Sequence, residues 1–93
     1  MARHSVKLRI EGGVQGVGYR WWALEAARAL DLDGWVRNRH DGSVEILAIG
    51  EAQAIGDLAA ACFMGPRAAR VTAVVQTTAE DDGSVGFEQR ATV

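Results

Sequence analysis

Cysteine, proline and long apolar runs are all scarce in this chain of 93 residues. The single cysteine, Cys62, excludes an internal disulfide, and the small apolar residues around it predict a buried thiol rather than a nucleophile. No apolar stretch approaches the ~18 residues that span a bilayer, and residues 1–5 lack the apolar segment of a signal peptide. These absences predict a cytoplasmic protein that does not bind membranes.

An excess of positive charge is also missing. Ten Lys and Arg stand against twelve Asp and Glu, which gives a formal net charge of −2. Because no large basic field is available, nucleic-acid binding is not expected and any anion site must be local. The two histidines, His4 and His40, are expected on the surface and have no Cys or carboxylate at metal-ligand spacing. The sequence therefore predicts no metal site.

The composition is that of one globular domain. Hydrophobic residues make up 48% and charged residues 24% of the chain, far from the signature of a disordered protein. The length suits a single core, and no repeat or long linker divides the sequence. We expect one domain over residues 1–93.

Two kinds of apolar pattern follow one another along the chain. Period-2 alternation predicts strands at 6–10, 43–49 and 71–77, and a short apolar run predicts another at 35–38. Apolar spacings of three and four predict helices at 20–30 and 51–63. The predicted apolar stripes are Tyr19, Trp22, Ala23, Ala26 and Leu30 on the first helix, and Ile55, Leu58, Ala59 and Cys62 on the second.

Pairs of residues that contain one glycine are expected to separate these elements. Asp33-Gly34 is expected to end the first helix and Gly65-Pro66 the second, while Asp41-Gly42 predicts a hairpin turn. Residues 80–83 are expected to form a solvated acidic loop. Trp21, Trp22 and Trp35 are expected in the core or in a pocket wall rather than as a base-stacking surface.

The resulting order is β, α, β, β, α, β, with Phe87 in a possible short fifth strand. This order predicts an α+β fold of the ferredoxin-like (split βαβ) class. In such a fold an antiparallel sheet carries two helices on one face, which buries both apolar stripes in one core.

The segment from Gly12 to Arg20 (GGVQGVGYR) lies between a predicted strand and a predicted helix. Glycines let the backbone curl so that N–H groups converge, and a helix start adds unpaired donors and partial positive charge. The segment has neither the Lys-Ser/Thr of a Walker loop nor the third glycine of a dinucleotide loop. Arg20 can bind two phosphate oxygens in parallel. These residues leave two interpretations open: a phosphate cradle, or a turn whose glycines serve only geometry beside a solvated arginine.

Three segments, Val14-Gln-Gly-Val-Gly-Tyr-Arg20, Gly34-Trp-Val-Arg-Asn38 and Asp41-Gly-Ser-Val-Glu45, closely resemble signature segments of the acylphosphatase family. The resemblance continues through Gly65-Pro66 and Ala69-Arg-Val71, so it covers nearly the whole chain. It implies a hydrolase that cleaves the carboxyl-phosphate bond of small acyl phosphates to a carboxylate and inorganic phosphate. It also implies that this reaction uses no metal or cofactor and takes place on a ferredoxin-like domain.

The resemblance also implies roles for particular residues. Arg20 takes the position of the family's phosphate-binding arginine, and Asn38 that of the asparagine that orients the attacking water. The loop whose backbone amides hold the phosphate corresponds to Gln15, Gly16, Val17, Gly18 and Tyr19. The chain departs from the common pattern at three positions: Tyr19 replaces Phe, Gly13 stands where many members have Arg, and Gln89 occupies an apolar position near the end, where only strand packing is expected to be affected.

The chemistry of an acyl phosphate agrees with what the sequence lacks. The departing carboxylate needs no protonation, so neither a general acid nor a nucleophilic cysteine is required. In-line attack by water spreads charge over oxygens that the loop amides and Arg20 can hold more tightly in the transition state. Asn38 can orient a water through its amide, or it can serve only to open the hairpin.

Three other functions agree less well with the sequence. A non-catalytic small-anion sensor is disfavoured because both Arg20 and Asn38 are present, and an RNA-binding module because an exposed aromatic sheet motif and a basic surface are missing. The leading domain of a larger carbamoyl-phosphate-handling maturation protein is not expected, because the sequence ends at Val93. The expectation is a monomer that acts on a small-molecule acyl phosphate.

Overall fold

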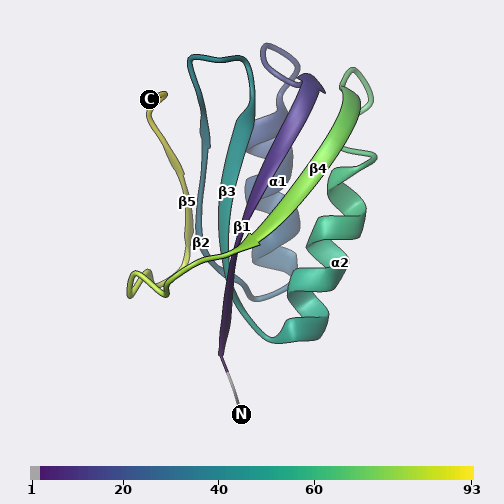
Figure 1. The fold of residues 1–93 in the computed structure, drawn as a ribbon. Helices are drawn as coiled ribbons and strands as arrows, with labels where there is room; N and C mark the ends of the chain where they lie inside the picture. The colour runs from purple at the N-terminus through teal and green to yellow at the C-terminus, as the bar shows by residue number, and fades with distance from the viewer. Residues whose placement is uncertain (1–2) are drawn as a thin grey trace.

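The computed structural model describes residues 3–93 as a five-stranded sheet with two helices on one face (Figure 1). The strand order is β4-β1-β3-β2-β5. No helix within the described residues is long and apolar enough to span a membrane. The predicted ferredoxin-like α+β class is confirmed. The elements are β1 (His4–Gly13), α1 (Tyr19–Ala29), β2 (Asp33–Asn38), β3 (Val44–Gly50), α2 (Ala52–Cys62), β4 (Arg70–Thr78) and β5 (Phe87–Arg90).

The sheet is mixed rather than wholly antiparallel. β1 pairs antiparallel with β3 and β4, and β2 pairs antiparallel with β3, but β5 runs parallel to β2. The cause is topological. β4 ends at the edge of the sheet where β1 and β2 begin, and the chain then crosses to the far side of the sheet (Figure 1), so β5 starts at the same edge as β2.

The main core lies between the sheet and the two helices. Val6, Leu8 and Ile10 of β1 enter it by strand alternation, as predicted. On α2 the predicted residues Ile55, Leu58 and Cys62 are buried and Ala59 is half-buried. On α1 the buried face is rotated from the predicted stripe, because the helix packs against β2 and β5 together. Its buried residues are Tyr19, Ala23, Leu24 and Ala27, while Trp22, Ala26 and Leu30 are half-buried.

Asp33-Gly34 does not end the first helix, contrary to the prediction. The helix stops at Ala29, Asp31 adopts a φ of 55°, and Asp33 and Gly34 open β2. Gly34 has a φ of 130°, and a Cβ there would collide with the backbone carbonyl of Leu47 on β3. This glycine therefore permits the close approach of two strands rather than the termination of a helix.

The sheet face opposite the helices carries a smaller cluster and a set of ion pairs. Trp35, Leu47 and Ile49 pack together with Ala79, and the indole N–H of Trp35 donates to Asp82 at 3.1 Å. Asp82 belongs to the loop at 80–83, which is exposed as predicted. The basic side chains of this face pair with carboxylates: Arg37 with Glu45 at 2.6 Å, Lys7 with Glu45 at 3.7 Å and Arg9 with Asp41 at 2.7 Å.

Candidate active site

The connection between β1 and α1 is a glycine-rich loop at residues 14–18. Gly16 and Gly18 have φ values of 73° and 79°, a conformation that is strained for any side chain with a Cβ. Val14 is only 1% exposed and fixes the start of the loop to the core. Gly18 fixes the end, because its carbonyl accepts the N–H of Trp22 at 3.0 Å as the first bond of α1. The loop is thus held at both ends.

Backbone donors are free along this loop and the first turn of α1. Within residues 3–93, the N–H groups of residues 15–21 donate no hydrogen bond to the protein. The N-terminus of a helix also carries a partial positive charge from the aligned peptide dipoles. Free N–H groups in this field form the type of site that binds phosphate through the main chain alone.

Asn38 reaches the same end of the molecule from β2. β1 and β2 both run antiparallel to β3, so their last residues lie at the same edge of the sheet, where Figure 1 shows the β1–α1 loop and the β2–β3 hairpin. Val36 faces the main core, and Asn38, two residues further on, lies on the same helix-covered face. The side chain of Asn38 therefore lies on the same side of the sheet as α1.

Arg20 and Asn38 line one pocket of about 260 Å³. Arg20 is half-buried, and its Nη1 lies 3.4 Å from the backbone carbonyl oxygen of Arg90, longer than an ordinary hydrogen bond. Within the described residues this is the one hydrogen bond of the guanidinium, so most of its donors are available to a ligand. The full lining is Val14, Gly16, Gly18, Tyr19, Arg20, Trp21, Asn38 and Gln89.

Two of the predicted phosphate-loop residues, Gln15 and Val17, do not line the pocket. The Gln15 side chain donates to the carbonyl oxygens of Arg39 at 2.7 Å and Ser43 at 2.9 Å, which ties the loop to the β2–β3 hairpin. Val17 is half-buried and packs against the main core. Both side chains hold the loop in place, and only their backbone N–H groups are free to contact a ligand.

Tyr19 borders the pocket, but its ring belongs to the core. The side chain is 2% exposed, its hydroxyl donates to the carbonyl oxygen of Cys62 at 2.7 Å, and the Trp22 ring packs edge-on at 5.3 Å. Burial, together with the neighbouring Cys62, raises the pKa of Tyr19 far above its ordinary value. Burial also raises the pKa of the Cys62 thiol to about 11. The predicted burial of this cysteine is confirmed.

Three residues of the pocket, Val14, Trp21 and Gln89, were not among the predicted site residues. Trp21 is 59% exposed and forms a pocket wall, one of the two places expected for it. Gln89 follows Phe87 on the same face of β5, and Phe87 is buried, so Gln89 emerges at the edge of the core beside α1. From the sequence, Gln89 was expected to affect only the packing of the last strand, because the sequence does not reveal that β5 pairs with β2.

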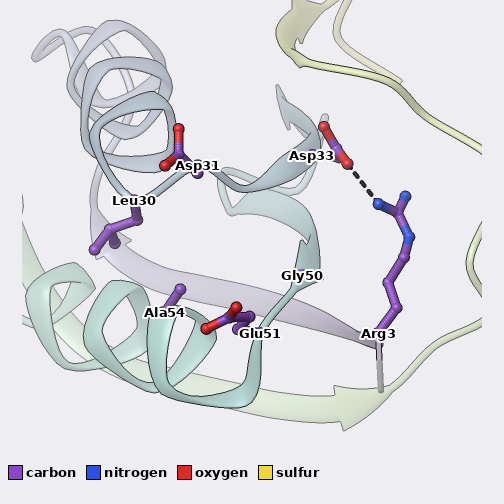
Figure 2. Close-up of a pocket in the computed structure, with 7 residues that line it drawn as sticks. All are labelled: Arg3, Leu30, Asp31, Asp33, Gly50, Glu51 and Ala54. Carbon is purple, nitrogen blue, oxygen red and sulfur yellow. Dashed lines mark hydrogen bonds and ion pairs between the residues drawn. The ribbon is translucent and has the colours of Figure 1, made fainter. Parts of the chain in front are cut away.

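The charge of this pocket suits an anion. Arg20 is its one ionised side chain near neutral pH, and no carboxylate or histidine lies among the lining residues. A hollow of about 330 Å³ at the other end of α1 has the opposite character (Figure 2). There Arg3 is paired with Asp33 at 2.6 Å, which leaves the carboxylates of Asp31 and Glu51 to repel an anion. Its lining is Arg3, Leu30, Asp31, Asp33, Gly50, Glu51 and Ala54.

Comparison with known proteins agrees with this geometry. The sequence model of the family described as Acylphosphatase matches residues 6–89. An acylphosphatase from Acidiphilium cryptum is 48% identical over 92 residues, which cover 99% of this chain and 98% of that protein. The acylphosphatase structure from Bacillus subtilis is 34% identical, with a TM-score of 0.89 over 92% of this chain and 97% of that chain.

A larger protein contains the same fold. The full-length HypF structure matches 98% of this chain with a TM-score of 0.90, and the match covers 12% of the HypF chain. The sequence identity is 22%, which is low enough that the match shows the fold alone. The family match and the relatives of similar length decide the identification. The chain belongs to the acylphosphatase family and is a hydrolase that cleaves the carboxyl-phosphate bond of small acyl phosphates.

Proposed function

We propose that Arg20 and the backbone N–H groups of residues 15–20 bind the phosphate group, while Asn38 orients the water that attacks phosphorus in line. The observation that carries this proposal is the pocket itself. Arg20 and Asn38 come from different elements, yet they line one pocket beside the free N–H groups that open α1. The loop glycines leave room for a ligand to approach the backbone closely.

The transition state of phosphoryl transfer places its charge where these donors lie. The equatorial oxygens carry the spread negative charge, and donors fixed before the reaction need no reorganisation to hold it. Gly18 is the N-cap of α1 and Gln15 is bonded to the β2–β3 hairpin, so the loop is already organised. Arg20 adds a planar guanidinium that can contact two oxygens at once.

The attacking water does not need a protein base. None of the residues that line the pocket is a carboxylate or a histidine, and the hydroxyl of Tyr19 is engaged with the carbonyl of Cys62. The Asn38 amide accepts from a water and donates to an oxygen without taking a proton. The proton then passes to a phosphate oxygen of the substrate. The profile of kcat/KM against pH is expected to show no enzymic base near neutrality, and a residue titrating there would contradict this step.

Substitution of Arg20 tests the anion site. Arg20→Ala is expected to lower kcat/KM by about 10²–10³ or more, because one fixed donor group of the transition state is lost. Binding of inorganic phosphate, measured by calorimetry, should be lost with it. Arg67→Ala removes the same charge from an exposed position outside the pocket and serves as the control. Normal phosphate binding by Arg20→Ala would defeat the assignment.

Substitution of Asn38 tests whether this residue acts on the attacking water or on the phosphate. Asn38→Ala is expected to lower kcat strongly while phosphate affinity stays within about twofold, since the amide acts on the nucleophile. Gln76→Ala, which removes an exposed amide on β4, is the control. Equal loss of phosphate affinity and rate would show instead that Asn38 contacts the phosphate or only supports the hairpin.

The remaining parts of the proposal concern the state in which the protein works. Residues 1–93 act as a single acylphosphatase-like domain, monomeric and cytoplasmic, without metal, cofactor or nucleic acid. The basic residues of the open sheet face are paired with carboxylates, which supports a protein that does not hold RNA. Sedimentation equilibrium, turnover in the presence of a chelator and a gel shift with RNA test these points.

A further inference from the structure

An exposed aromatic side chain, Trp21, stands directly beside the phosphate pocket. Trp21 follows Arg20 in the first turn of α1, and both line the pocket. The other aromatic residues of this region, Tyr19 and Trp22, pack into or against the main core, whereas Trp21 is outside it and 59% exposed. Packing of the fold therefore does not account for the position of this indole.

The pocket has more room than a phosphate group needs. A phosphate occupies the space of a few water molecules, each about 30 Å³ in the liquid, and the pocket measures about 260 Å³. In an in-line reaction the leaving group lies opposite the attacking water. If Asn38 holds the water and the loop holds the phosphate, the acyl group leaves toward the part of the lining that neither occupies. Trp21 is the large apolar side chain of that lining.

We propose that Trp21 binds the acyl group and selects acyl phosphates with an apolar, flat acyl moiety. This inference rests on the phosphate site proposed above. An indole offers a wide apolar face that stacks on aromatic or unbranched apolar groups, whereas an acetyl or carbamoyl group covers little of it. Trp21 is thus a specificity-determining residue, and Arg20 with the loop amides binds the phosphate that all substrates share.

The test compares two substrates, benzoyl phosphate and acetyl phosphate, in wild type and Trp21→Ala. The substitution is expected to lower kcat/KM for benzoyl phosphate about 2- to 12-fold, the range of one aromatic contact. The change should appear mainly in KM, because the contact is present in both the bound substrate and the transition state. For acetyl phosphate kcat/KM should stay within about twofold. Trp21→Phe should restore most of the benzoyl preference, since it keeps an aromatic face.

Controls separate this inference from the site on which it rests. Phe63→Ala removes another exposed aromatic, 58% exposed and away from the pocket, and should change neither substrate. Phenylphosphonate and methylphosphonate, used as inhibitors, report the same selectivity without turnover, and Trp21→Ala should weaken only phenylphosphonate. An equal change for both substrates, or no change, would overturn the role of Trp21 and leave Arg20 untouched. Failure of the phosphate site would appear as acetyl phosphate turnover that survives Arg20→Ala.

Discussion

The hydroxyl of Tyr19 links the start of the active-site helix to the end of the other helix, and its removal is the sharpest test of how the site is held. The hydroxyl donates to the carbonyl oxygen of Cys62 at 2.7 Å, and within residues 3–93 that carbonyl accepts no other hydrogen bond. Tyr19→Phe leaves a buried acceptor unpaired, which costs about 1–2 kcal/mol. For a domain of this size the melting temperature should fall by about 5–15 °C.

The Tyr19→Phe variant should be less stable than wild type but equally active. The Tyr19 side chain is buried in the core and its hydroxyl is bonded to the Cys62 carbonyl, so kcat/KM should stay within about twofold of wild type. Calorimetric melting and benzoyl phosphate turnover at a temperature where both proteins are folded measure the two effects. Thr77→Val, which removes an exposed hydroxyl on β4, is the control. A large loss of kcat at unchanged melting temperature would show that the hydroxyl acts on the substrate, against the structure.

Two further predictions concern the core. Gly34→Ala places a methyl group against the Leu47 carbonyl at a positive φ and should destabilise the fold by at least about 2 kcal/mol. Gly56→Ala, at an open position on α2, should be neutral or stabilising by up to about 1 kcal/mol. Urea unfolding of both variants measures the two effects, and equal effects would contradict the close approach of β2 and β3. The pKa of the buried Cys62 thiol is raised to about 11. At pH 8 this thiol should react with a disulfide reagent at least ~100-fold more slowly in the native protein than in urea. Rapid labelling of the native protein would show instead that the thiol is accessible.

Much of the site could be predicted from local sequence. Gly16 and Gly18 fall in a segment between a strand and a helix, and the order of those elements follows from periodicity in the printed residues. A helix start with free N–H groups can bind an anion, so Arg20 in the first turn made an anion site one of two interpretations, and the resemblance to the family favoured it. Cys62 was likewise expected to be buried from its apolar neighbours, and it is.

Other features of the site depend on pairings between distant segments. Gln15 was expected to act through its backbone amide, and nothing in the sequence indicated that its side chain bonds to the β2–β3 hairpin. Gln89 was treated as a packing residue, yet the parallel pairing of β5 with β2 places it in the pocket. Asp33-Gly34 was expected to end a helix, and it opens a strand because β3 lies against Gly34.

The sequence by itself determined the elements, their order and, through the resemblance of its segments, the family, since these depend on short-range periodicity, glycine conformation and runs of residues within single segments. Only the tertiary structure decided the direction of β5, the face that α1 buries and the meeting of Asn38, Trp21 and Gln89 in one pocket. The physical reason is that strand pairing and helix packing join residues far apart in the chain, and local propensity contains no information about which partner each one meets.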